Sequence, residues 1–363
     1  MWRRAIVATI AIGVSMGCNG DKKAPAADTA AATPAVASKP AHTDFTSGGP
    51  YLFVSNEDGN DVTVISAKTD SVVATLVPGQ RPRGVRVSPD GKVLIVAVSG
   101  SPKAGPGVDE KSLPPADRTK DGIALIDLAT GQKVANLPGG IDPEAFAISS
   151  DGTTIYVSNE DGGSLTLIDV ASRKIIGTVP IGSEPEGVQI HPDNKVLYAT
   201  NEGSGTVSVL DLRTKNIIAT FPTGKRPRGI AFTPDGKKAY ITNEVGGTVT
   251  VVDAKRHKTM KNITIPGEGA KPMGTAMAPD GKHLYITTGR GGAAAVIDTK
   301  SDTVVTTFPV GKRPWGIAVS ADGKWIYTAN GPSNDISVID ASTNQVVKHI
   351  PGGKSPWGIA ISK

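Results

Sequence analysis

A motif of proline, one variable residue and a small residue recurs seven times along the chain. Each copy opens an apolar stretch, and the prolines are Pro82, Pro143, Pro185, Pro227, Pro272, Pro314 and Pro356. The copies are 42 to 45 residues apart, except for a first interval of 61 residues. A fixed period of about 40 to 45 residues, with several short strands in each unit, is typical of a β-propeller. No unit of such a protein buries its own faces, so the units must pack against one another.

Each repeat contains four short runs of β-branched or aromatic residues separated by turn residues, most clearly at residues 227–266. A Pro-Asp-Gly-Lys turn links the first run to the second, with glycine at the position of positive φ. One copy has Asn194 at this position, and asparagine is the other residue that tolerates a left-handed backbone. The pattern therefore predicts blades of four antiparallel strands.

The two ends of the repeat region complement each other. The first unit, residues 51–78, has only the second, third and fourth strands, and residues 357–361 supply only a first strand. Pairing the carboxy-terminal strand with the amino-terminal blade would remove two open sheet edges. The sequence thus predicts an all-β fold, a seven-bladed propeller over residues 50–363 closed by its last strand.

The amino terminus has the pattern of an export signal. Residues 1–17 combine two arginines with an apolar run of 12 residues, too short for a membrane span. Cys18, the only cysteine, follows this run as in a lipoprotein signal, so we expect it to be lipidated. Residues 18–49, rich in alanine, proline and threonine, are expected to form a disordered tether. The predicted location is the periplasm or cell envelope, anchored to a membrane, with a soluble periplasmic protein as the alternative.

The charge distribution gives little support to nucleic-acid binding. The formal net charge of +5 falls to +3 when Arg3 and Arg4 leave with the signal. The loops after the fourth strands carry a basic cluster, namely Arg81, Arg83, Lys225, Arg226, Arg228, Lys271, Lys312, Arg313 and Lys354. The same face also carries acidic residues, which would repel a duplex: Glu57, Asp58, Asp61, Glu160, Asp161, Glu202 and Glu244. A DNA-binding propeller is therefore the third-ranked function, and a monomer is expected.

Two families of loops are expected to meet at the mouth of the central channel, because strands alternate in direction. The fourth-strand loops supply the variable residue of each motif: Arg83, Glu144, Glu186, Arg228, Met273, Trp315 and Trp357. The second-strand loops supply Asn-Glu pairs: Asn159 with Glu160, Asn201 with Glu202, and Asn243 with Glu244. These thirteen residues are the candidate binding site, for an unknown periplasmic protein or a small anionic or planar ligand.

Structural explanations for the same residues stay open. Exposed loops can vary without any function, and Trp315 and Trp357 could pack in the core instead of meeting a ligand. Asparagines at strand ends commonly satisfy loop backbone groups. The long first interval places an insert at residues 99–121 on this face. This insert is either a lid over the mouth or a solvent-exposed loop.

No pattern of a known catalytic or metal centre is present. The histidines are scattered, and the sequence has no Cys-x-x-Cys-His, no His-Glu-x-x-His and no Gly-x-Ser-x-Gly. We therefore expect no cofactor, no metal and a non-catalytic binding scaffold. The alternative is a propeller lactonase or hydrolase, in which Arg83, Arg228, Glu144 and Glu186 polarise and protonate a small carboxylate substrate.

The second strands resemble those of a known family. Tyr-Val-Ser-Asn at 156–159, Tyr-Ala-Thr-Asn at 198–201 and Tyr-Ile-Thr-Asn at 240–243 resemble the YVTN-repeat bacterial β-propellers. The stretches 312–316, 329–335 and 356–358 are similar to the propeller proteins associated with PQQ-dependent alcohol catabolism. The resemblance implies a secreted seven-bladed protein that binds a partner near periplasmic quinoprotein dehydrogenases. Blade five departs from the pattern, with Thr-Thr-Gly at 287–289, so ligand contact there is doubtful.

Overall fold

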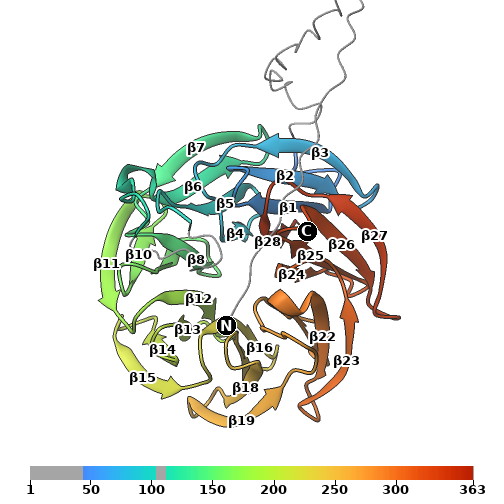
Figure 1. The fold of residues 1–363 in the computed structure, drawn as a ribbon. Coiled ribbons are helices and arrows are strands. Elements are labelled where there is room, and N and C mark those ends of the chain that lie inside the picture. Colours follow the sequence, from blue (N-terminus) through green and yellow to red (C-terminus); the bar gives the residue numbers. More distant parts are fainter. Residues whose placement is uncertain (1–43, 104–111, 363) are drawn as a thin grey trace, which may run out of the picture. The chain divides into compact units, whose positions relative to one another are not determined.

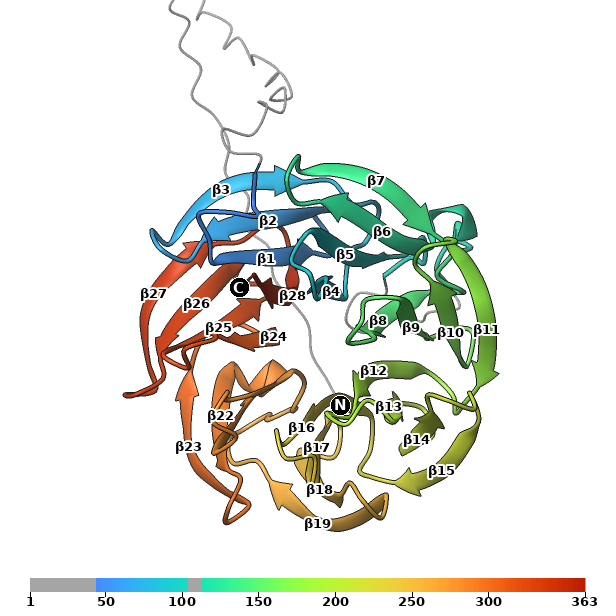
Figure 2. The same cartoon turned by 180° about the vertical axis from the view of Figure 1, so that it is seen from behind.

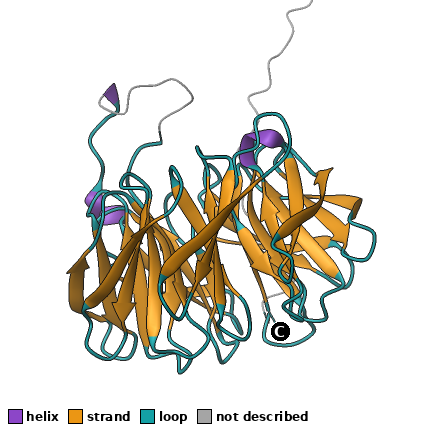
Figure 3. Ribbon diagram, turned by 90° about the horizontal axis from the view of Figure 1, so that it is seen from below, coloured by secondary structure: helices purple, strands orange, loops and turns teal. Residues whose placement is uncertain are grey.

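The computed structural model describes residues 44–103 and 112–362. These residues form seven four-stranded antiparallel sheets, arranged as blades around a central axis (Figure 1; Figure 2 shows the ring from behind). Seen from the side, the strands run between two faces covered by loops (Figure 3). The predicted all-β, seven-bladed propeller is confirmed.

Blades 1 to 3 follow one another along the chain, with the innermost strand first. Blade 1 contains β4 (Val85–Val87), β5 (Val93–Val98), β6 (Gly122–Asp127) and β7 (Gln132–Leu137). Blade 2 contains β8 (Pro143–Ile148), β9 (Thr154–Asn159), β10 (Ser164–Asp169) and β11 (Lys174–Pro180). Blade 3 contains β12 (Pro185–Ile190), β13 (Val196–Asn201), β14 (Thr206–Asp211) and β15 (Ile217–Pro222).

Blades 4 to 6 repeat this order. Blade 4 contains β16 (Pro227–Phe232), β17 (Lys238–Asn243), β18 (Thr248–Asp253) and β19 (Lys258–Thr264). Blade 5 contains β20 (Thr275–Met277), β21 (His283–Thr287), β22 (Ala293–Asp298) and β23 (Thr303–Pro309). Blade 6 contains β24 (Pro314–Val319), β25 (Trp325–Asn330), β26 (Asp335–Asp340) and β27 (Gln345–Pro351). Two short 3-10 helices, η2 (Arg118–Lys120) and η3 (Gly289–Gly291), lie in second-strand loops.

Blade 7 joins the two ends of the propeller. Its inner strand is β28 (Pro356–Ile361), which pairs with β1 (Tyr51–Asn56), followed by β2 (Asp61–Ser66) and β3 (Ser71–Leu76). The antiparallel register places Leu52 opposite Ile361 and Val54 opposite Ile359. The predicted closure of the ring by the last strand is therefore confirmed.

The core lies between neighbouring blades, and a tyrosine in the second strand of each of three blades also links its blade to the next. The Tyr198 hydroxyl lies 2.6 Å from Nδ1 of His257, and the Tyr240 hydroxyl donates to Asp302 at 2.6 Å. Lys215 donates to the Tyr156 hydroxyl at 3.1 Å. The three partners are turn residues with positive φ: Lys215, His257 and Asp302. The tyrosine of the sequence pattern thus holds the turn between strands three and four of the following blade.

Close packing of the innermost strands fixes the position of the mouth residues. A Cβ added to Gly316 would lie 2.6 Å from the carbonyl oxygen of Trp357, which leaves room only for glycine. A hydroxyl in the second strand binds the carbonyl of the next blade's variable residue, as in Thr200 to Arg228 at 3.0 Å. Thr287 binds the Trp315 carbonyl in the same way at 2.7 Å. The variable side chains are therefore held by backbone contacts that repeat around the ring.

The amino-terminal boundary differs from the expected one. The expected tether extends to residue 49, but Phe45 is buried and its ring makes edge contacts with Tyr51 and Phe53. Its backbone N–H also donates to the Leu128 carbonyl at 2.7 Å. The boundary prediction is corrected, because burying the aromatic side chain of Phe45 against the propeller is more favourable than leaving it exposed in a solvated tether. The signal, Cys18 and most of the tether lie outside the described residues.

Within the described part of the chain, no helix is long and apolar enough to cross a membrane. The described ends of the insert are held by ion pairs to neighbouring blades. Lys103 contacts Glu57 at 2.6 Å, and Arg118 contacts Asp161 at 2.6 Å. Residues 104–111, where a lid would have its tip, lie outside the described residues.

Candidate functional site at the mouth of the central channel

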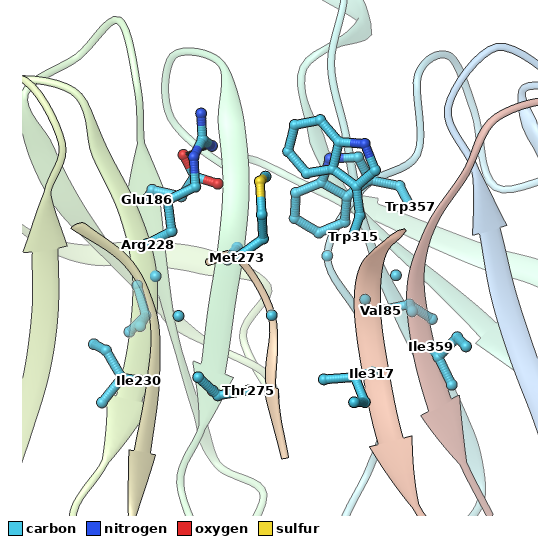
Figure 4. A pocket seen from close by; sticks show the side chains of 18 of the residues that line it. Val85, Glu186, Arg228, Ile230, Met273, Thr275, Trp315, Ile317, Trp357 and Ile359 are labelled. Carbon is cyan, nitrogen blue, oxygen red and sulfur yellow. Dashed lines mark hydrogen bonds and ion pairs between the residues drawn. The ribbon is translucent and has the colours of Figure 1, made fainter. Parts of the chain in front are cut away.

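The central channel contains a cavity of about 260 Å³ lined by the innermost strands of all seven blades. Charged, sulfur-containing and aromatic side chains lie at its mouth, and aliphatic side chains lie deeper (Figure 4). The mouth residues shown there are Glu186, Arg228, Met273, Trp315 and Trp357. The deeper residues are Val85, Ile230, Thr275, Ile317 and Ile359. This arrangement gives a small pocket with an apolar wall and a polar entrance.

Arg83 is buried at the blade 1 side of the mouth. Its Nη2 lies 2.5 Å from Oδ1 of Asp142, and its Nη1 forms an ion pair with Glu144. Nη1 is also 3.3 Å from Oε2 of Glu160. Asp142 accepts a further hydrogen bond from Ser99. Because the Arg83 side chain is only 2% exposed, it holds these carboxylates together and is not open to a ligand.

Arg228 is the centre of a second cluster on the opposite side of blade 3. Its guanidinium forms an ion pair with Glu186, lies 2.8 Å from Glu202 and donates to Glu244 at 2.6 Å. Arg226 also pairs with Glu202. The surrounding carboxylates raise the pKa of Arg228, against the opposing effect of burial. Arg228 is thus charged and fully paired.

Glu160 differs from the other mouth carboxylates because it lies between the two clusters and is 30% exposed. Burial, which is the largest cause, raises its pKa to about 7. The charges of Glu186 and Asp142 raise the pKa further, and Arg83 and Arg228 oppose this effect. Glu160 does not line the central cavity itself but a surface hollow beside it, together with Glu202 and Arg226. A partly exposed carboxyl group that titrates near neutral pH is suited to general acid-base catalysis.

The two tryptophans form a stacked pair on the opposite side of the mouth. The ring centroids of Trp315 and Trp357 are 6.0 Å apart, with an angle of 24° between the planes. Both indoles line the cavity, and Met273 lies beside them, itself buried. The guanidinium carbon of Arg228 is 5.5 Å from the Trp315 ring centroid. The structure therefore brings together the apolar and charged sectors expected from the sequence.

The three candidate asparagines do not lie in the mouth. Asn159, Asn201 and Asn243 are fully buried inside their own blades. Their side-chain amides donate to hydroxyls of the third strand, for example from Asn201 to Ser208 at 2.9 Å. Their assignment to the binding site is corrected, because their polar groups are used to hold the loops in place. Only the glutamate of each pair reaches the mouth clusters.

Two functional candidates are not among the thirteen residues proposed from the sequence for the binding site, although Arg313 was counted there in the basic cluster of this face. Asp142 is one, since it precedes the motif and reaches Arg83 only in the folded ring. Arg313 is the other: its guanidinium carbon is 4.8 Å from the Trp315 ring centroid, and no ion pair of Arg313 occurs among the described residues. Arg81 and Arg226 hold the same place in their repeats, and each pairs with a glutamate of the preceding blade. The blade before Arg313 has Gly289 at the position of that glutamate. The sequence therefore already indicated that Arg313 lacks this partner.

The described residues contain no group of three or more His, Cys, Asp or Glu side chains arranged to hold a metal ion. No described histidine lines the cavity. His191 and His257 lie between blades 3 and 4, where His191 packs against Phe232 and His257 contacts Tyr198.

The fold and the mouth define a seven-bladed propeller with a charged, partly apolar central pocket. Two protein-family models each match part of the chain. The model of the seven-bladed β-propeller lactonase family matches residues 182–349. The model of the cytochrome D1 heme domain matches residues 116–231. Haem iron takes an axial His, Cys, Met or Tyr, and of these types only Met273 lines the described cavity. No curated protein matches the sequence.

Solved structures share the fold at low sequence identity. Hydrazine synthase from Kuenenia stuttgartiensis is 24% identical with a TM-score of 0.69, over 80% of this chain and 92% of that one. A Bacteroides fragilis protein assigned as a 6-phosphogluconolactonase is 18% identical with a TM-score of 0.71, over 88% and 99%. A Bacteroides uniformis protein with the same assignment is 18% identical with a TM-score of 0.70, over 86% and 99%.

The lactonase match overturns two expectations drawn from the sequence. A non-catalytic scaffold was the main functional expectation, and the absence of enzymatic activity followed from it. The match favours the alternative, a propeller lactonase or hydrolase. The sequence contains no familiar nucleophile or metal motif. Carboxyl groups that are brought together from different blades leave no such motif in the sequence.

Proposed function

We propose that this protein is a hydrolase that opens small lactones at the mouth of its central channel. The lactonase family match over residues 182–349 carries the proposal, because this segment supplies Glu186, Arg228, Arg313 and Trp315. The carboxylates gathered around Arg83 and Arg228 support it further, and Glu186 of the second cluster lines the central cavity.

Glu160 is the proposed general base and acid. Its unprotonated form takes a proton from water as the water oxygen attacks the carbonyl carbon of the ester. The bond between that carbon and the ring oxygen then breaks, and protonated Glu160 returns the proton to the leaving oxygen. One lactone and one water thus give one hydroxy acid. A pKa of about 7 lets the same carboxyl group serve both steps at neutral pH.

Arg313 is the group proposed to stabilise the negative charge that develops on the carbonyl oxygen of the lactone. Arg83 and Arg228, assigned this role from the sequence, are already paired with carboxylates. Arg313 has no such ion pair among the described residues and lies against Trp315. An unpaired guanidinium in a partly desolvated mouth stabilises a developing oxyanion more strongly than a paired one.

Hydrolysis of a panel of five- and six-membered lactones, with and without a carboxylate substituent, tests the proposal by pH-stat titration. We expect turnover of at least one lactone, and a loss of about 100-fold in kcat for Glu160→Gln. Arg213→Gln, on an exposed turn, is the control and should keep full activity. No hydrolysis above the buffer rate, or equal rates for Glu160→Gln and the unmodified protein, would refute the proposal.

Membership of the YVTN-repeat group, and kinship with PQQ-associated propellers, are further proposals based on the repeated Tyr-x-Thr/Ser-Asn strands. Export and lipid anchoring through Cys18 are likewise proposals based on the amino-terminal sequence. Labelling with a radioactive fatty acid, compared between the unmodified chain and Cys18→Ala, tests the anchor. Equal labelling of both chains would exclude it.

A further inference from the structure

Arg86 is the one charged residue in the described lining of the channel that has no counter-ion. It follows Val85 on β4 and lines the cavity together with Gln189 of β12. Its Nε donates to the Phe146 carbonyl at 2.8 Å, and its Nη2 donates to the side-chain oxygen of Gln189 at 3.1 Å. No ion pair of Arg86 occurs among the described residues, whereas Arg228 in the same lining pairs with Glu186.

The repeat shows that Arg86 and Gln189 are departures from a common pattern. Five blades have alanine at the second position after the small residue of the motif: Ala147, Ala231, Ala276, Ala318 and Ala360. The long polar side chains of blades 1 and 3 meet in the hydrogen bond from Arg86 to Gln189. An alanine suits the packing at this position, so the fold itself does not require an arginine there.

Arg86 carries its charge at a partly buried position without a counter-ion. Burial lowers the pKa of Arg86, and no carboxylate opposes this effect. A guanidinium nevertheless stays protonated in proteins, so the charge remains in the channel. A charge held away from water without a partner is unfavourable. Arg86 has five N–H donors, of which the two hydrogen bonds above use two.

We infer that Arg86 and Gln189 bind the carboxylate of a small monoanionic ligand inside the central channel. A planar guanidinium matches a carboxylate through two parallel hydrogen bonds. The single uncompensated charge suits a monoanion, and the cavity of about 260 Å³ limits the ligand to a small molecule. Val188, Ile230 and Ile317 line the same cavity and would contact the hydrocarbon part of the ligand.

The inference deepens the proposed function by naming a substrate class. A lactone with a carboxylate substituent would place that group on Arg86 and its ester bond nearer the mouth. This role in substrate recognition rests on the proposed function, but carboxylate binding itself does not. The site is therefore tested by binding without turnover.

Isothermal titration calorimetry with benzoate, and with benzamide as its uncharged counterpart, tests the site. The unmodified protein should bind benzoate at least about tenfold more tightly than benzamide. Arg86→Gln should lose this preference, and Arg86→Lys should keep part of it, because a lysine retains the charge without the planar geometry. Arg213→Gln is the control and should bind benzoate as the unmodified protein does, and Arg313→Gln tests whether the anion lies at the mouth instead.

Three results would overturn the inference. Equal affinities of the unmodified protein for benzoate and benzamide would do so, whether or not Arg86→Gln folds. Full benzoate binding by folded Arg86→Gln would do so as well. Loss of binding in Arg313→Gln alone would place the anion at the mouth instead. Benzoate binding without lactone hydrolysis would refute only the proposed function, and hydrolysis without benzoate binding would refute only this inference.

Discussion

Oε2 of Glu160 lies 3.3 Å from Nη1 of Arg83, yet this ion pair does not hold the carboxyl group ionised at neutral pH. Arg83 is shared with Asp142 and Glu144, which are closer to it. Burial raises the pKa of Glu160 to about 7, and the charge of Arg83 opposes this effect only in part. Blade 1 thus supplies one arginine to three carboxyl groups, and the most exposed of the three titrates near neutral pH.

Glu160→Gln should change how stability depends on pH. The folded pKa of about 7 exceeds the ordinary value of 4.5, so protonated Glu160 favours the folded state. This contribution is complete below about pH 4.5 and is lost as the pH rises through 7. The loss is at most about 3 kcal/mol, since the side chain is partly exposed. Urea unfolding from pH 4 to 8 should show the loss in the unmodified protein, and parallel curves for both proteins would contradict it.

Arg83→Met should destabilise the propeller by about 3 to 5 kcal/mol, because it leaves buried carboxylates without their cation. Arg226→Met is the matched control. Arg226 also pairs with a glutamate, but its side chain is 45% exposed, so its loss should cost less than about 1 kcal/mol. Chemical unfolding at pH 7.5 measures both changes. Similar losses of stability in the two variants would show that burial does not decide the strength of these pairs.

His257→Asn should remove a source of acid sensitivity. Burial and the nearby charge of His191 lower the pKa of His257, and the charges of Asp253 and Asp193 offset this only in part. The folded state therefore favours the neutral ring. This stability is present above the ordinary pKa of 6.5 and declines as the pH falls below it. Asparagine suits the positive φ of 51° at this turn.

Thermal unfolding at pH 7.5 and pH 5 measures this effect. The unmodified protein should lose more stability on acidification than His257→Asn. Tyr198→Phe should cost about 1 kcal/mol at pH 7.5, because the hydrogen bond to His257 is lost. An equal acid response of the histidine and asparagine proteins would contradict the assignment to His257.

Removal of residues 356–363, which include β28, should lower the melting temperature by at least about 10 °C. The truncation exposes the edge of β1 and uncovers Leu52 and Val54, which face β28 across the pairing. Removal of Lys363 alone is the control and should leave the melting curve unchanged. An unaltered melting temperature after removal of the whole strand would contradict closure through β28.

Gly316→Ala should destabilise the protein by about 1 to 3 kcal/mol, because the new Cβ would meet the Trp357 carbonyl at 2.6 Å. The shift should also disturb the stacking of Trp315 on Trp357, which near-ultraviolet circular dichroism detects. Gly177→Ala in the outer strand β11 is the control, since its Cβ would meet no atom closer than 3.8 Å. A native tryptophan signal in Gly316→Ala would show that the inner strands can move apart.

The fold was predictable because the Pro-x-small motif recurs seven times and the turn and strand patterns recur in most blades. The turn at Asn194, with φ of 58°, and the pairing of β28 with β1 both follow from the pattern of glycines, turns and β-branched runs. These features depend on backbone conformation and on short-range spacing, which a sequence displays directly. The buried position of Phe45 was missed, because a single aromatic residue before the repeat has no periodic context.

The candidate site was only partly predictable, because its interactions cross from one blade to the next. Sequence alone determined that Arg83, Glu160, Arg228 and Trp315 share one face of the ring. Only the tertiary structure decided that Arg83 is neutralised by Asp142, that Glu160 titrates near neutral pH and that Arg86 has no counter-ion. Charge pairing and burial depend on distances of a few ångströms between residues some 60 to 100 positions apart, and closure of the ring sets those distances.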